Sequence, residues 1–137
     1  MTTEQAEAQP TSLQRHVLVV DDDELLREVA KASLELVGGW RVSTAASGAE
    51  ARRRAAAEQP DAILLDVMMP GLDGPTTLAG LRADASTRGI PVIFLTAKVA
   101  SEDMPGWRRL GLAGVIPKPF DPMTLAADIA DLLGWRE

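Results

Sequence analysis

The chain has 137 residues, with 20 acidic and 14 basic side chains, a net charge of −6 and no cysteine. This length fits one domain that buries about two-thirds of the surface its unfolded chain exposes. The composition excludes disulfides and thiolate metal sites, and the acidic balance argues against a nucleic-acid partner, which would require clustered Lys and Arg.

A polar leader, residues 1–14, precedes the first apolar run and lacks the basic start and apolar stretch of a secretory signal. No later run approaches the roughly 18 apolar residues that a membrane span needs. We therefore expect a cytoplasmic protein without a membrane partner, in which a flexible leader is followed by one domain over residues 15–137.

Five short apolar runs alternate with longer amphipathic segments. Three of them, VLVV, AILL and PVIFL, are continuously apolar, which is typical of strands buried on both faces of a parallel sheet. The alternation predicts an α/β fold with a doubly wound five-stranded parallel sheet of order 2-1-3-4-5, covered by helices on both faces. The predicted strands are residues 17–20, 41–45, 62–65, 91–95 and 113–116.

The segments between the strands carry helix signals. We expect Asp23 to cap the first helix, and Ser47 with Glu50 forms a capping box before the second. Gly74-Pro75 and Asp121-Pro122 open the third and the last helix, because Pro is tolerated in a first turn. The predicted inner faces are Leu26, Val29, Ala30, Ser33, Leu34 and Val37 in the first helix, which ends before Gly38-Gly39, and Leu125, Ile129, Leu132 and Leu133 in the last.

A fourth helix is expected within Ser101–Leu110, where it should be short or begin late. Met104-Pro105-Gly106 interrupts it, and a Pro inside a helix removes a hydrogen bond at about 3 kcal/mol. We interpret Arg52-Arg53-Arg54 as the solvated face of the second helix, and His16 as ordinary packing at the start of the first strand.

Polar residues follow four of the predicted strands, and ligands of open α/β sheets bind beyond the carboxyl ends of the strands. With strands 1 and 3 adjacent, Asp21, Asp22 and Asp66 should converge, and Lys118 could reach back toward Asp66. Carboxylates about 5 Å apart repel by roughly 3 kcal/mol at an effective dielectric near 20, so they either share a proton or bind a cation. The residues concerned are Asp21, Asp22 and Asp23 after strand 1, Asp66 after strand 3, Thr96 after strand 4 and Lys118 after strand 5.

Carboxylate ligands with open positions suit Mg²⁺, which often bridges to a phosphate. A carboxylate beside Mg²⁺, a Thr hydroxyl and a Lys ammonium is a workable phosphoryl acceptor. Singly, each of these residues would be a turn residue, a cap or a surface charge. In combination they make Asp66 the expected phosphoacceptor and Mg²⁺ the expected cofactor.

These residues lie in motifs that resemble the receiver domain of two-component response regulators, over about residues 16 to 134. The motifs are VLVVDDD at 17–23, ILLDVMMPGLDG at 63–74, VIFLTAK at 92–98 and KPF at 118–120. The resemblance implies a flavodoxin-like receiver fold and a signalling phosphoacceptor rather than an enzyme, one that assists its own phosphorylation and dephosphorylation.

The resemblance also assigns roles to individual residues. Asp66 would accept a phosphoryl group from a phosphohistidine on a sensor histidine kinase or a phosphotransfer protein. Asp21, Asp22, Asp66 and the carbonyl of Met68 would hold Mg²⁺. Thr96 and Lys118 would contact the phosphoryl oxygens, and the bond between Lys118 and Pro119 would be cis.

Three departures from the family's pattern bear on output. Val115 stands where the family usually has Tyr or Phe, Met104-Pro105-Gly106 falls in the fourth helix, and Pro117 removes a strand N–H. We expect a stand-alone receiver that acts through an unknown downstream protein. Its change on phosphorylation should travel through Lys98–Leu110, where Trp107 would report it.

Other functions fit the residues less well. A Mg²⁺-dependent phosphatase of the haloacid dehalogenase type also uses a strand-end Asp, but it needs a second acidic residue two positions later, where Met68 stands. A flavodoxin-like cofactor carrier would need a Ser/Thr/Gly-rich loop after strand 1, where this chain has three carboxylates that would repel a phosphate. A dinucleotide site would need G-x-G-x-x-G, which the sequence lacks. A receiver scaffold that has lost phosphorylation would not need the complete acidic cluster.

Overall fold

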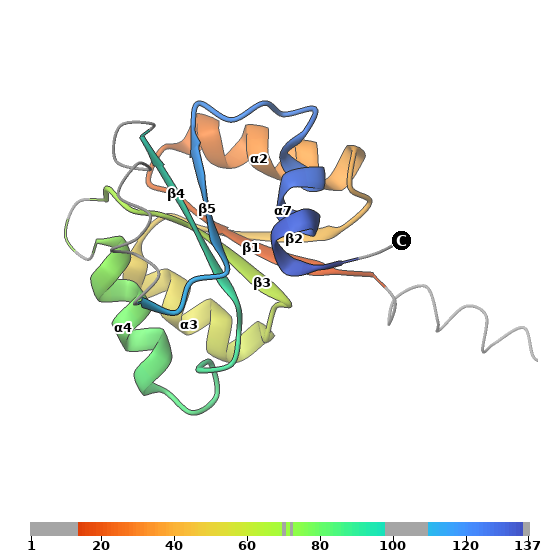
Figure 1. The fold of residues 1–137 in the computed structure, drawn as a ribbon. Helices are drawn as coiled ribbons and strands as arrows, with labels where there is room; N and C mark the ends of the chain where they lie inside the picture. Colours follow the sequence, from red (N-terminus) through yellow and green to blue (C-terminus); the bar gives the residue numbers. More distant parts are fainter. Residues whose placement is uncertain (1–13, 70, 72, 98–109, 136–137) are drawn as a thin grey trace, which may run out of the picture.

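A computed structural model describes residues 14–69, 71, 73–97 and 110–135 of the chain. Its centre is a five-stranded parallel sheet of order β2-β1-β3-β4-β5, which confirms the predicted topology (Figure 1). The strands are β1 (His16–Val20), β2 (Arg41–Ala45), β3 (Ala62–Asp66), β4 (Val92–Ala97) and β5 (Gly114–Lys118). The helices are α2 (Glu24–Leu36), α3 (Gly48–Glu58), α4 (Gly74–Ala83) and α7 (Leu125–Leu133).

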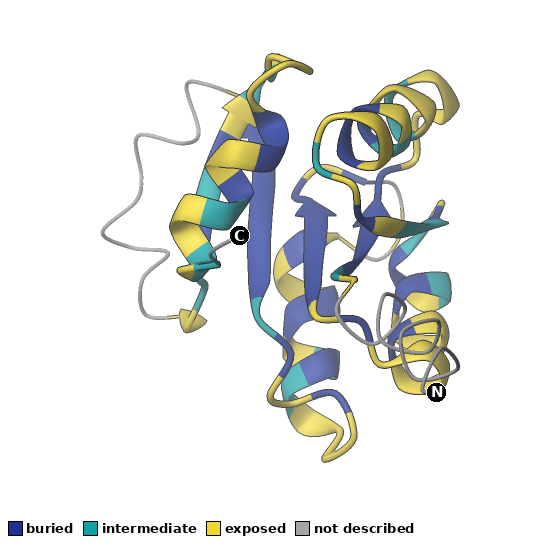
Figure 2. Ribbon diagram, turned by 90° about the vertical axis from the view of Figure 1, so that its right-hand side faces the viewer, coloured by how far each residue is buried: buried dark blue, intermediate teal, exposed yellow. Residues whose placement is uncertain are grey.

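Helices cover both faces of the sheet, with α2 and α7 on one side and α3 and α4 on the other (Figure 1). Alternate residues of β1 supply the two cores: Val17 and Val19 pack with the α2 and α7 side, and Leu18 and Val20 with the α3 and α4 side. The sheet is therefore buried on both faces, while the outer faces of the helices are exposed (Figure 2). Continuous apolar runs predicted this arrangement.

Side-chain caps fix three of the helix starts where the sequence predicted them. Asp23 Oδ1 accepts hydrogen bonds from the Leu25 and Leu26 amides, at 3.0 and 3.3 Å. Ser47 Oγ accepts from the Glu50 amide at 3.1 Å, and Glu50 Oε1 accepts from the Ala46 amide at 2.9 Å. The third helix, α4, begins at Gly74-Pro75 as expected, behind the cap residue Asp73. These caps satisfy amides that a helix start leaves without partners.

Some predicted helix details are wrong. The last helix begins at Leu125 and not at Asp121-Pro122, because Asp121 organises a turn first. Its side chain accepts from the Met123 amide at 2.9 Å, and its carbonyl accepts from the Thr124 amide at 3.0 Å.

Three side chains assigned to inner faces are exposed. Val29 of α2 and its C-cap residue Val37 are exposed, because the buried residues of α2 form the narrower stripe of Ala30, Ser33 and Leu34. Leu132 of α7 packs over Gly114 of the edge strand β5 but remains 39% exposed.

The strand bounds also differ from the prediction at the carboxyl edge. Asp66, Thr96 and Lys118 lie within the last residues of β3, β4 and β5, and not after them. Pro117 is exposed on the edge strand β5, a position where a missing N–H is tolerated. The expected fourth helix, its Met104-Pro105-Gly106 interruption and Trp107 lie outside the described residues.

The segments before β1 and after α7 lie side by side. The rings of Trp40 and Trp135 make an edge-to-face contact with centroids 5.1 Å apart, and the Arg15 guanidinium carbon lies 4.6 Å from the Trp135 ring centroid. Trp40 and Trp135 belong to the same core cluster as α2 and α7. Within the described residues, no helix is long and apolar enough to cross a bilayer.

His16 does more than fill space at the start of β1. Its Nε2 lies 2.6 Å from Ser43 Oγ and 3.6 Å from Glu58 Oε1. Burial, and then the charge of Arg41, lower the pKa of His16 against the opposing effect of Glu58 and Asp61. By contrast, Arg52-Arg53-Arg54 forms an exposed helix face as predicted.

Candidate functional site

Three carboxylates meet at the carboxyl edge of the sheet. Asp66 ends β3 and Asp21 follows β1, and both are buried, whereas Asp22 is exposed. One oxygen from each of the three lies within 4.8 Å of the others. The parallel pairing of β1 with β3 aligns their ends and produces this convergence, as the strand order predicted.

Lys118 reaches the acidic cluster from the far edge of the sheet. Its Nζ lies 3.2 Å from Asp21 Oδ2 and 3.2 Å from Asp66 Oδ1. Burial opposes the charged ammonium, but the two carboxylates outweigh it and raise the pKa of Lys118. The side chain therefore stays protonated and supplies one positive charge to the cluster.

One ammonium does not balance the buried negative charge. Burial, and then the charge of Asp21, raise the pKa of Asp66, although Lys118 and the Met68 amide act in the opposite direction. That amide donates to Asp66 Oδ1 at 3.2 Å. The ionised site consequently favours an additional cation.

Two buried oxygens of the site have no hydrogen-bond partner in the described part of the chain: Asp21 Oδ2 and Thr96 Oγ1. Asp21 Oδ2 is nevertheless ion-paired with the Lys118 ammonium at 3.2 Å. Buried polar atoms without partners are rare in folded proteins and mark places where a ligand or ion can bind. Both belong to residues that the sequence predicted as ligand contacts.

The donor set fits Mg²⁺. Carboxylate oxygens are the hard ligands that this ion prefers, and within the described residues Asp21 Oδ2 has only the ion pair with Lys118. Met68, the fourth expected ligand through its carbonyl, lies beside the cluster because its amide is bonded to Asp66.

Two further predicted residues are placed by β5. Val115 pairs in register with Phe94 and packs, partly buried, against the core on the α3 and α4 side. The peptide bond between Lys118 and Pro119 is cis.

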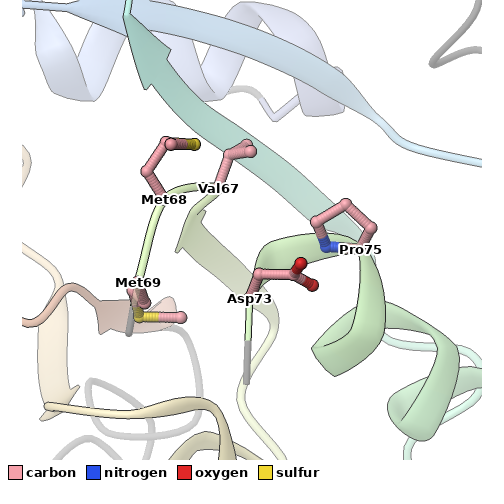
Figure 3. Close-up of a pocket in the computed structure, with 5 residues that line it drawn as sticks. All are labelled: Val67, Met68, Met69, Asp73 and Pro75. Carbon is pink, nitrogen blue, oxygen red and sulfur yellow. The ribbon is translucent and has the colours of Figure 1, made fainter. Parts of the chain in front are cut away.

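A depression of about 480 Å³ lies next to the acidic cluster, between the end of β3 and the start of α4 (Figure 3). No motif in the sequence indicated this depression. Residues 68 and 69 are a pair of methionines that diverge, since Met68 is exposed and Met69 is buried. The lining residues are Val67, Met68, Met69, Asp73 and Pro75.

Sequence reasoning also missed Arg27. Its Nη1 donates a hydrogen bond of 2.8 Å to the main-chain carbonyl of Asp21. The only available signal was its place on the first turn of the helix that follows Asp21–Asp23, which does not by itself indicate a contact.

Known proteins are similar to this chain in sequence and fold. The family model described as the response regulator receiver domain matches residues 17–130. Response regulator Rre1 of Synechocystis is 38% identical over 130 residues, covering 95% of this chain and 54% of Rre1. Response regulator PleD of Caulobacter vibrioides is 39% identical over 120 residues, covering 88% of this chain and 26% of PleD.

Solved structures agree. The chemotaxis protein CheY4 of Vibrio cholerae superimposes with a TM-score of 0.79 at 30% identity, over 87% of this chain and 98% of that one. The receiver domain of the sensor histidine kinase PA1611 from Pseudomonas aeruginosa gives 0.76 at 31% identity, over 88% and 98%. That structure holds a magnesium ion in its active site cleft.

The sheet order is that of a CheY-like receiver fold, a fold of two-component signalling proteins. The chain belongs to the response regulator receiver domain family. It spans about half the length of Rre1 and a quarter of PleD.

Proposed function

We propose that this protein is a phosphoacceptor in a two-component or phosphorelay system, and that Asp66 receives the phosphoryl group. The observation that carries the proposal is the position of Asp66: a buried carboxylate within 3.2 Å of the Lys118 ammonium, beside two further carboxylates. The receiver domain would span residues 15–137, with residues 1–14 outside it.

In the proposed reaction a carboxylate oxygen of Asp66 attacks the phosphorus of a phosphohistidine. An O–P bond forms, the P–N bond breaks, and its electron pair returns to the imidazole nitrogen. Lys118 offsets the charge of the transferred oxygens, and the hydroxyl of Thr96, which has no partner among the described residues, is available to donate to one of them. A buried acyl phosphate would thus replace one negative charge by a more negative group.

Asp21, Asp22, Asp66 and the carbonyl of Met68 would hold Mg²⁺. Bound there, the ion would offset negative charge on the phosphoryl oxygens during transfer. The chain's own contribution is to hold Asp21 Oδ2 and Asp66 Oδ1 each 3.2 Å from the Lys118 ammonium, so that the carboxylates converge at one place.

The surface near the site suits a protein partner. Leu25, Met68 and Met123 are 69%, 73% and 70% exposed, and each follows a residue of the site closely in the sequence. A kinase or phosphotransfer protein could cover these apolar side chains while presenting its histidine to Asp66. We propose a cytoplasmic location and output through protein–protein contact, with neither nucleic acid nor membrane as partner.

Acetyl phosphate with Mg²⁺ tests the proposal. Intact-mass measurement should show one added phosphoryl group, labile to base, which maps to Asp66 and is absent in Asp66→Asn. An adduct that persists in Asp66→Asn would refute the assignment. Continuous release of inorganic phosphate from many donor molecules, without a stable adduct, would favour the phosphatase alternative.

A further inference from the structure

We propose that Arg27 is a positioning residue for the metal and phosphoryl site, acting through the main-chain carbonyl of Asp21. The inference rests on the proposed function, because it concerns how the same site is assembled. Arg27 itself would touch neither the ion nor the phosphoryl group.

Arg27 belongs to two interactions in the turn between β1 and α2. Its amide donates to the Asp23 carbonyl at 3.0 Å, which is the first-turn hydrogen bond of the helix. Its Nη1 donates to the Asp21 carbonyl at 2.8 Å. Helical side chains point toward the helix N-terminus, so residue 27 is well placed to reach back to residue 21. The partly buried guanidinium therefore ties the start of α2 to the end of β1.

The second observation is how completely Asp21 is fixed. Its amide donates to the Ala45 carbonyl at 3.1 Å, and its Oδ1 accepts from the Asp23 amide at 2.9 Å. Arg27 holds its carbonyl. The polar atom left without a hydrogen bond among the described residues is Oδ2, which faces Lys118. The amide, the carbonyl and Oδ1 of Asp21 are thus each hydrogen-bonded, and these three bonds fix the direction of Oδ2.

Removing the guanidinium would release one of these three constraints. A hydrogen bond from a charged donor is about twice as strong as a neutral one. Without it the Asp21–Asp23 turn should fluctuate more, and Asp21 Oδ2 would spend less time directed at the site. Residues that orient metal ligands typically change metal affinity by about 10- to 100-fold when they are removed.

A purely electrostatic role predicts the opposite sign. A guanidinium near three carboxylates repels a divalent cation, so its removal would strengthen Mg²⁺ binding. A positioning role predicts weaker binding. Mg²⁺ affinity therefore distinguishes the two explanations by direction as well as by size.

The test compares Arg27→Met and Arg27→Lys with the wild type, using Arg53→Met as the control, since Arg53 is an exposed arginine on another helix. Mg²⁺ affinity is measured by calorimetric titration. Amide exchange at Asp23 is followed by NMR in metal-free protein. We expect Arg27→Met to bind Mg²⁺ about tenfold more weakly and to exchange the Asp23 amide faster. Arg27→Lys should be intermediate, and Arg53→Met should match the wild type.

Mg²⁺ affinity in Arg27→Met equal to or tighter than the wild type, with Asp23 exchange unchanged, would overturn the inference. If Arg27→Met does not fold, Arg27→Lys decides, since it keeps the charge but offers one donor group in place of the planar fork. If the wild type takes up neither Mg²⁺ nor a phosphoryl group, the proposed function fails. Asp23 exchange in metal-free Arg27→Met would then still decide whether Arg27 fixes the turn.

Discussion

Asp66 is held in a position that disfavours its own charge. Burial and the neighbouring Asp21 raise its pKa, so the native state binds this proton more tightly than the unfolded state does. The resulting contribution to stability is present at low pH and is lost as the pH rises through the raised pKa. Once ionised, the Asp66 side chain therefore makes the metal-free fold less stable than it is with the carboxyl protonated.

We predict that Asp66→Asn stabilises the metal-free protein at pH 7 by roughly 1–3 kcal/mol, the scale of one close carboxylate pair at an effective dielectric near 20. Urea denaturation with a chelator present measures the change. The difference between variant and wild type should shrink toward pH 4. A less stable variant at pH 7 would show that the Lys118 ion pair outweighs the repulsion.

We predict that His16 makes the stability of the fold depend on pH in the opposite direction. Burial lowers its pKa, so the unfolded state binds the proton more tightly and the native state loses stability as the pH falls through the unfolded value of about 6.5. Because the chain has one histidine, His16→Gln should flatten the curve of unfolding free energy between pH 7.5 and 5.5. Parallel curves for the two proteins would mean that Glu58 and Asp61 compensate for the burial.

At the scale of secondary structure, the approach of α4 to β3 leaves no room for a side chain. A Cβ on Gly74 would lie 2.8 Å from Val67 Cα and 3.1 Å from the Asp66 carbonyl oxygen. The Gly74 amide also donates to the Val67 carbonyl at 3.0 Å. The start of α4 therefore packs directly against the backbone of Asp66 and Val67.

We predict that Gly74→Ala destabilises the protein by about 1–3 kcal/mol, because the clash is with backbone atoms that cannot move aside cheaply. It should also slow phosphorylation by acetyl phosphate. Gly89→Ala is the matched control, since a Cβ there would meet nothing within 4 Å. Equal unfolding free energies for the two variants would contradict the close fit.

The sequence predicted elements better than it predicted their ends. Continuous apolar runs identified β1, β3 and β4, because strands buried on both faces need apolar residues on both sides. The edge strands β2 and β5 are only partly buried, and their shorter apolar patterns in the β-α alternation located them. The predicted fifth strand nevertheless ends at residue 116, whereas β5 continues to Lys118, because Pro117 and Lys118 lack the apolar character of a buried strand. Likewise, Val29 and Val37 follow the helical period, but which side of α2 faces α7 depends on tertiary packing.

The positions of the candidate site residues were predictable from the sequence, but some of their contacts were not. Strand order implied that Asp21, Asp22 and Asp66 converge, because parallel strands end at one edge. The contact of Arg27 and the depression beside Met68 depend on side-chain directions that no motif specifies.

For the molecule as a whole, the acidic cluster should couple folding to metal. An ion that binds only the native state stabilises it by mass action, about 2.7 kcal/mol at a hundred times the dissociation constant. We predict that Mg²⁺ raises the melting temperature of the wild type and that Asp22→Ala loses most of this shift. Asp22 is exposed, so the variant should fold normally without metal. Equal shifts in both proteins would remove Asp22 from the ligand set.

The contact of Arg15 with Trp135 has a consequence for chain connectivity. Since these residues touch, a linker of a few residues could join their ends and close the backbone into a ring. New ends could then be opened at the exposed residues Ala85 and Ser86, in the connection between α4 and β4. That connection enters β4 at the edge opposite the acidic cluster. Such a circular permutant should fold and still accept a phosphoryl group, because the order in which the strands are joined does not determine where their carboxyl ends meet.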